Sequence, residues 1–150
     1  MPDLATEGTA DSTVDWGALR DAAARVLDRA YAPYSGYPVA AAGITGTGEV
    51  LTGVNVENAS YGLTLCAECS LVSQLTLVPG SASGVRPELH AVVCLDAEQQ
   101  LITPCGRCRQ LLYEFRPAEP GAALLVLTNE GPLSIEALLP YAFGPQHLST

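Results

Sequence analysis

Two segments hold four of the five cysteines of this chain, CAEC at residues 66–69 and PCGRCRQ at residues 104–110. Each segment offers two thiols spaced three residues apart, and the first also carries Glu68. Thiolates are common zinc ligands. A catalytic zinc site usually has three protein ligands and an open position, whereas a structural site closes all four positions. The two segments therefore predict a zinc site, and the number of cysteines that bind decides which kind it is.

Both segments are expected at the starts of helices. The apolar pattern predicts one helix from near Cys66 through Leu77, stopped by Pro79-Gly80, and another over Gly106–Phe115. Helix N-termini carry a partial positive charge, which lowers thiol pKa values and steadies thiolates around a metal. A carboxylate such as Glu68 beside the metal can take up protons and return them to a substrate.

The remaining pattern predicts an α/β chain. An apolar stripe with three- and four-residue spacing predicts an amphipathic helix between Asp15, its N-cap, and Tyr31. Further expected elements are a hairpin of strands 37–44 and 49–56 joined at 46–48, a loop at 80–84, strands 89–95 and 123–128, and a short helix from its cap Ser134 through Leu139. Such an order predicts a mixed sheet covered by helices on both faces.

Composition narrows the class of protein. With 150 residues and 48% hydrophobic content, we expect one domain over residues 14–150 after a disordered tail at residues 1–13. No apolar stretch approaches the roughly 20 residues of a membrane span, and no secretory signal is visible, so a cytoplasmic protein without membrane contact is expected. Seven arginines against sixteen acidic residues give a charge of -9, which argues against a nucleic-acid partner. Cys94, in an apolar run, is expected to be an ordinary core residue.

Five motifs follow one another along the chain: APYS at 32–35, NVENASYGLTLCAE at 55–68, PCGRCRQ at 104–110, LTN at 127–129 and LLPYAF at 138–143. In this order they resemble one known family, the homotetrameric zinc-dependent cytidine deaminases of pyrimidine salvage. The resemblance implies a three-layer α/β/α fold with a mixed, about five-stranded sheet. It also implies hydrolytic deamination of cytidine and 2'-deoxycytidine to uridine and 2'-deoxyuridine, with release of ammonia. Zinc deaminases as a class pair a cysteine-rich zinc site with a glutamate that is not a ligand.

The resemblance also assigns roles to individual residues. Cys66, Cys105 and Cys108 would bind one zinc ion per subunit, and Glu68 would shuttle protons. For the nucleoside substrate, Asn55 and Glu57 would bind the ribose 3'-hydroxyl, Ala67 would offer backbone contacts to the base, and Tyr37 would line the pyrimidine pocket. Phe143 would reach into the active site of a neighbouring subunit of a homotetramer.

The chain departs from the family pattern in two places. Family members commonly have Arg directly after the catalytic Glu, where this chain has Cys69, and Arg107 is a candidate to replace the missing positive charge. Cys69 itself is expected to be a buried thiol near the site. The stretch from Thr128 to Ser134 is short, so the fifth strand is expected to be brief or missing.

Other interpretations stay open at this point. The four cysteines could form a closed structural zinc site in a protein without catalysis. Asn55 and Glu57 could simply hold a turn, and Arg109, at a helix start where cations are disfavoured, is expected to have a buried structural partner. Within enzymes, the runner-up is deamination of another cytosine nucleoside such as blasticidin S, since that related group also resembles the PCGRCRQ segment.

Overall fold

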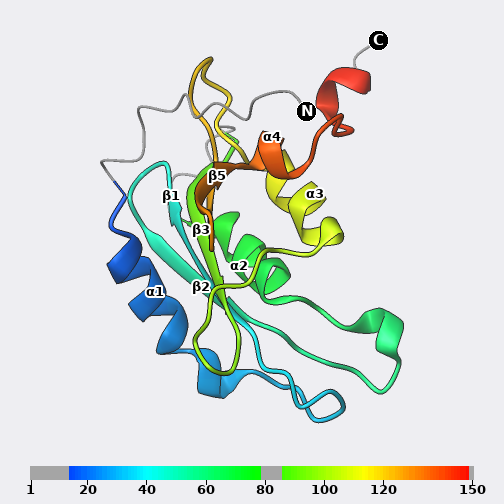
Figure 1. Ribbon diagram of the computed structural model, residues 1–150. Coiled ribbons are helices and arrows are strands. Elements are labelled where there is room, and N and C mark those ends of the chain that lie inside the picture. Colours follow the sequence, from blue (N-terminus) through cyan, green and yellow to red (C-terminus); the bar gives the residue numbers. More distant parts are fainter. Residues whose placement is uncertain (1–13, 79–85, 149–150) are drawn as a thin grey trace.

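The computed structural model describes residues 14–78 and 86–148 (Figure 1). The expected tail at 1–13, the Pro79-Gly80 stop and the loop at 80–84 lie outside the described residues. Among the described residues, no helix is both long and apolar enough to cross a membrane.

The sheet has five strands in the order β2-β1-β3-β4-β5. The strands are β1 Ala40–Thr45, β2 Val50–Val54, β3 Leu89–Leu95, β4 Leu125–Thr128 and β5 Gly131–Ser134. Of the strand pairs among the described residues, only β3–β4 is parallel, so the sheet is mixed, as predicted. The fifth strand is present but only four residues long, which confirms that it is brief and shows that it is not missing.

In the described part of the chain, four α-helices accompany the sheet: α1 Trp16–Ala24, α2 Ala67–Leu75, α3 Gly106–Glu114 and α4 Ile135–Leu138. The Asp15 carboxylate accepts a hydrogen bond of 2.9 Å from the Ala18 N–H, and the Ser134 hydroxyl accepts one of 3.2 Å from the Ala137 N–H. Both predicted caps are therefore confirmed. The first helix is shorter than expected, because after Ala24 the chain tightens into a 3-10 turn at Leu27–Arg29.

The helices cover both faces of the sheet, which gives the three layers expected from the sequence (Figure 1). The helix α1 packs against one face, where β3 presents Ala91, Val93 and Leu95. The helices α2 and α3 pack against the other face, where β3 presents Val92 and Cys94. Residues of one strand alternate between the faces, so a single strand serves two different layers.

Candidate zinc and catalytic site

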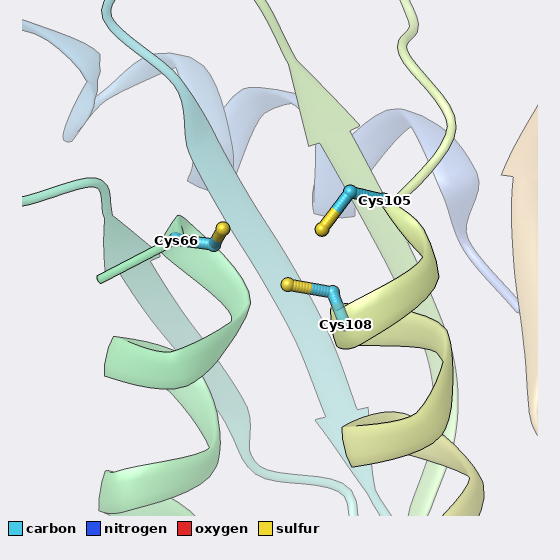
Figure 2. Close-up of side chains that lie close together, drawn as sticks. All are labelled: Cys66, Cys105 and Cys108. Carbon is cyan, nitrogen blue, oxygen red and sulfur yellow. The ribbon is translucent and has the colours of Figure 1, made fainter. Parts of the chain in front are cut away.

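Three cysteines converge where α2 and α3 begin. Cys66 is the N-cap of α2, Cys105 is the N-cap of α3, and Cys108 lies on the first turn of α3. Figure 2 shows their side chains directed toward one another, and their Sγ atoms all lie within 4.8 Å of each other. Cys108 is buried whereas Cys105 is exposed, so the cluster sits at the edge of the core, open to one side.

The donor set fits zinc. With Zn–S bonds of about 2.3 Å and tetrahedral angles, sulfur ligands lie roughly 3.8 Å apart, which agrees with the observed cluster. Cys69 is not part of the cluster, although it comes from the same Cys-x-x-Cys segment as Cys66. Three sulfurs leave a fourth position open, so the geometry argues against the closed four-cysteine structural site.

Two contacts hold the start of α2 in place. Leu65, directly before Cys66, forms a two-hydrogen-bond bridge with Val56, both bonds being 2.9 Å long. On β2, a Cβ built at Gly53 would lie only 2.3 Å from the Ala67 carbonyl oxygen and 2.6 Å from the Leu71 nitrogen. Only glycine therefore lets the first turn of α2 approach the sheet so closely. Nothing in the sequence around Gly53 marks its contact with α2, since the atoms that it faces belong to residues distant in sequence.

Glu68 lies on the first turn of α2 and is only 4% exposed. Its Oε1 accepts a hydrogen bond of 3.5 Å from the Cys94 thiol on β3. Cys94 is fully buried and belongs to the core, as expected from the sequence, but its contact with Glu68 was not anticipated. The apolar run around Cys94 could not reveal the contact, because it depends on the register of β3 beneath α2.

The thiol pKa values differ within the site. Burial raises the pKa of Cys66 and that of Cys108, and the negative charge of Glu68 adds to both shifts. Burial also acts to raise the pKa of Cys105, but hydrogen bonds from the backbone and thiol of Cys108 and from Cys66 outweigh it, so this pKa is lowered. The expectation that helix N-termini lower the thiol pKa values thus holds for Cys105 only. At Cys66 and Cys108, the loss of hydration on burial has the larger effect and raises the pKa.

Asn55 and Glu57 both hold the segment that precedes β1. The buried Asn55 amide donates to the Tyr37 carbonyl (3.0 Å) and accepts from the Val39 N–H (2.9 Å). The Glu57 carboxylate accepts from the N–H groups of Tyr34 (2.9 Å) and Ser35 (3.2 Å) and from the Ser35 hydroxyl. The Ser35 hydroxyl lowers the pKa of Glu57. The turn-holding interpretation is therefore correct for both residues. Counted against their partners among the described residues, Asn55 keeps one N–H and one lone pair, and Glu57 keeps one lone pair.

Asn55 and Glu57 belong to a segment that a β-bridge between Val56 and Leu65 joins to the segment carrying Cys66. Asn55 and Glu57 flank Val56, whose partner Leu65 is adjacent to Cys66. A cavity of about 260 Å³ opens beside them, lined by Tyr34, Ser35, Glu57, Tyr61 and Thr64. The structure thus provides a hollow with one carboxylate and two aromatic side chains next to the segment that carries Cys66.

The other expected substrate residues differ in their surroundings. Ala67 is fully buried at the first position of α2, where a helix N–H has no intrahelical acceptor. Tyr37 is about half exposed. Phe143 is 56% exposed, stacks on the His147 ring at 5.2 Å between centroids, and is tied to α3 through a hydrogen bond of 2.9 Å from the Gln110 amide to its carbonyl.

The two arginines of the PCGRCRQ segment bind backbone carbonyls. Arg107 donates to the Thr64 carbonyl (3.3 Å), two residues before Cys66, so it links the chain segments that carry the cysteines. Arg109 donates to the carbonyls of Pro104 (2.8 Å) and Leu138 (3.1 Å) and joins the start of α3 to α4. Arg109 therefore has the part-buried structural partner expected from the sequence.

Comparisons with known proteins agree with this site. The family model described as "Cytidine and deoxycytidylate deaminase zinc-binding region" matches residues 17–120. The cytidine deaminase of Mycobacterium tuberculosis (strain CDC 1551 / Oshkosh) is 46% identical over 131 residues, covering 87% of this chain and 91% of that protein. Among solved structures, the cytidine deaminase from Mycobacterium leprae matches with a TM-score of 0.75 and 46% identity, covering 85% of this chain and 98% of its own.

A second solved structure, the cytidine deaminase from Burkholderia pseudomallei, matches with a TM-score of 0.68 and 37% identity, covering 87% of this chain and all of its own. The family match includes both cysteine segments and the helices that begin at them. The three converging sulfurs and the buried glutamate beside them are thus found in a chain that belongs to the cytidine and deoxycytidylate deaminase family of zinc-binding enzymes.

Proposed function

We propose that the protein is a cytidine deaminase that hydrolyses cytidine and 2'-deoxycytidine to uridine and 2'-deoxyuridine, with release of ammonia, in pyrimidine salvage. The observation that carries the proposal is the convergence of three sulfurs, those of Cys66, Cys105 and Cys108, beside the buried carboxylate of Glu68. These three cysteines would hold one zinc ion per subunit. When bound, zinc lowers the pKa of water and so makes a nucleophile available at neutral pH.

In this proposal Glu68 moves the protons of the reaction. Hydrolysis forms a C–O bond and breaks the C–N bond at C4 of the pyrimidine. The two hydrogens of water end on N3 of the ring and on the amino nitrogen, which leaves as ammonia with its own two hydrogens. The Glu68 carboxylate accepts one proton from the attacking water and delivers it to N3 of the base. It then carries the second proton, from the hydroxyl left on C4, to the leaving nitrogen. Its burial on the first turn of α2 keeps bulk water from competing for that proton.

The polar residues before α2 would select a nucleoside. Asn55 retains an N–H and a lone pair, and Glu57 retains a lone pair, with no partner among the described residues, and a ribose 3'-hydroxyl can both accept and donate. Leaving such groups unpaired when a bare base binds would disfavour that ligand. Both substrates carry this hydroxyl, so little discrimination at the 2' position is expected. Ala67 would contribute backbone contacts to the base, and Tyr37 would line the pyrimidine pocket.

The active form is proposed to be a cytoplasmic homotetramer. Within one chain Phe143 lies on the surface beside α3 and is more than half exposed, which suits a side chain that completes the site of a neighbouring subunit. Other large apolar side chains are also exposed near the site segments: Tyr31, Tyr34, Val56, Tyr61, Leu63 and Leu65. Exposed apolar surface of this extent supports an interface between subunits.

Arg107 is proposed to offset the negative charge of the site. Zinc with three thiolates carries a formal charge of -1, and this chain has Cys69 where family members commonly have Arg. The Arg107 guanidinium reaches across from α3 to the Thr64 carbonyl near Cys66, which brings a positive charge to the rim of the cluster. Arg107→Ala is expected to weaken zinc binding more than Arg107→Lys does. Equal zinc affinity in both variants and the parent would refute the idea.

The first experiment is ultraviolet-monitored turnover of cytidine and 2'-deoxycytidine by the parent and by Glu68→Gln, with zinc content measured in both. Activity in the parent alone, with zinc retained in both, supports the proposal. A parent that binds zinc but turns over neither nucleoside refutes it, and blasticidin S is then the next substrate to assay.

The neighbouring-subunit role of Phe143 can be tested by mixing. Glu68→Gln and Phe143→Ala should each be inactive alone, the second without loss of zinc. Subunits exchanged between the two would form some sites with an intact Glu68 from one chain and an intact Phe143 from another. Recovered activity in the mixture supports a shared site, whereas a mixture as inactive as its components contradicts it.

A further inference from the structure

The Cys94 thiol contacts the Glu68 carboxylate from the side of the sheet. Its Sγ lies 3.5 Å from Glu68 Oε1, and both side chains are buried, Cys94 completely and Glu68 to all but 4%. The two residues are 26 positions apart in the sequence and come from different layers, β3 and α2. The contact is therefore a product of the fold.

Small residues make this contact possible. On the neighbouring strand β1, the residue paired with Cys94 is Ala41, whose side chain is also fully buried. Gly53 on β2 lets the first turn of α2 come close to the sheet. The Glu68 side chain can then lie over β3, where the Cys94 thiol meets it.

A buried carboxylate needs hydrogen-bond donors, because unpaired burial of a charged group is costly. Within the part of the chain that the structure describes, the Cys94 thiol is the donor found on this carboxylate. Burial raises the pKa of Cys94 well above its ordinary value, with a further contribution from the negative charge of Glu68. The sulfur therefore keeps its proton and stays a donor.

We infer that Cys94 is a positioning residue for Glu68, holding Oε1 through its S–H so that Oε2 is presented for proton exchange with water and substrate. The inference rests on the proposed proton-shuttle role of Glu68. A free carboxylate would rotate about its last torsion angle, which is broad and roughly two-fold. The thiol restricts that rotation and so keeps one oxygen aimed at the reaction.

The test compares Cys94→Ala, which removes the donor, with Cys94→Ser, which replaces it by a hydroxyl. Cys94→Ala is expected to lower kcat for cytidine roughly 10-fold, the low end of the ~10–100-fold effect of outer partners at metal sites, with KM and zinc content unchanged. Cys94→Ser should recover most of the parental kcat. Val93→Ala, on the same strand but facing α1, controls for a small cavity and should keep the parental kcat.

The outcomes separate this inference from the proposal on which it rests. If Glu68→Gln is inactive but Cys94→Ala has the parental kcat, or if Cys94→Ser is as slow as Cys94→Ala, the positioning role is wrong. If Glu68→Gln remains active, the proton-shuttle role of Glu68 fails first. Should low expression limit kinetics, denaturant unfolding of Cys94→Ala, Glu68→Ala and the double variant gives a second test. Non-additive effects are expected, and additive ones would overturn the inference.

Discussion

The two faces of the sheet are built from the same strands but differ in chemistry. On the α1 face, Leu19 and Ala23 of the helix pack against Ala91, Val93 and Leu95 of β3. On the α2 and α3 face, β3 presents Val92 and Cys94, and α2 brings the Glu68 carboxylate into contact with Cys94. One face is an aliphatic support, and the other combines a core with a site.

The difference in chemistry between the two faces follows from how their helices begin. The helix α1 begins at a side-chain cap, Asp15, which satisfies an N–H of its own first turn. The helices α2 and α3 begin instead at Cys66 and Cys105, whose sulfurs belong to the cluster. Their N-termini face the cluster, so N–H groups of the first turn lie beside sulfur, as the backbone of Cys108 lies beside Cys105. This comparison leads to four predictions.

The largest effect is expected for Cys108→Ser on the site face. Loss of a direct ligand should weaken zinc binding by more than the ~10–100-fold seen for outer partners and abolish turnover. Zinc content after dialysis and competition with a chelator would measure this. The matched control is Cys69→Ser, outside the cluster, which should retain zinc. If both variants lost zinc equally, the site would have four sulfur ligands. It would then be a structural zinc site, and the two faces of the sheet would not differ in catalysis.

A pair of leucines compares the faces directly. Leu19 on α1 and Leu71 on α2 are both buried, and truncating either to Ala should lower the free energy of unfolding by about 2–5 kcal/mol. Only Leu71→Ala is expected to lower kcat as well, because α2 carries Cys66 and Glu68. Denaturant unfolding at fixed protein concentration, with kcat measured on the folded variants, tests this. An equal loss of kcat in Leu19→Ala would show that the two faces are not functionally separate.

Gly53→Ala tests the close approach of α2 to the sheet. The added Cβ would meet backbone atoms of Ala67 and Leu71, so α2 must shift, at a cost of roughly 1–3 kcal/mol and with a lower kcat. Gly17→Ala on α1 is the control, because its Cβ would make only an ordinary 3.4 Å contact with Asp15. That variant should be as stable as the parent or more so. A Gly53→Ala protein with parental kcat would contradict the account of how Glu68 is placed.

The smallest effect is expected at the rim of the site, for Ser35→Ala. The Ser35 hydroxyl lowers the pKa of Glu57 from its ordinary value of 4.5. The ionised carboxylate therefore stabilises the fold above pH 4.5, and this contribution is lost as the pH falls through the lowered pKa. The denaturation midpoint of Ser35→Ala should therefore lie furthest below the parental value near neutral pH, and the gap should narrow in acid.

A residual gap independent of pH is expected, because the Ser35 hydroxyl also accepts from the Tyr37 N–H. Thr76→Ala, which removes a hydroxyl bound to the Ser73 carbonyl only, should show a pH-independent difference. If the difference in denaturation midpoint between Ser35→Ala and the parent stays constant from neutral pH to acid, groups other than the Ser35 hydroxyl must lower the pKa of Glu57.

Much of the fold could be predicted from local patterns. The strand Leu89–Leu95 has the predicted bounds, α3 ends one residue before the predicted Phe115, and the caps Asp15 and Ser134 are as expected. The end of α1 was missed, because a 3-10 turn continues the same apolar stripe beyond Ala24. The spacing predicted a cysteine zinc site, and the resemblance to the family selected the three cysteines of the cluster. The contributions of Gly53 and Cys94 were not predicted, since each acts through a residue distant in sequence.

The sequence by itself determined the elements, their caps and the family, because hydrophobic period, capping side chains and ordered motifs are local properties of the chain. The tertiary structure alone decided that Gly53 lies against the first turn of α2 and that the thiol of Cys94 meets Glu68. Those outcomes depend on how closely α2 approaches the sheet and on the register of β3 beneath it. Such distances are set by packing between layers, which no local pattern records.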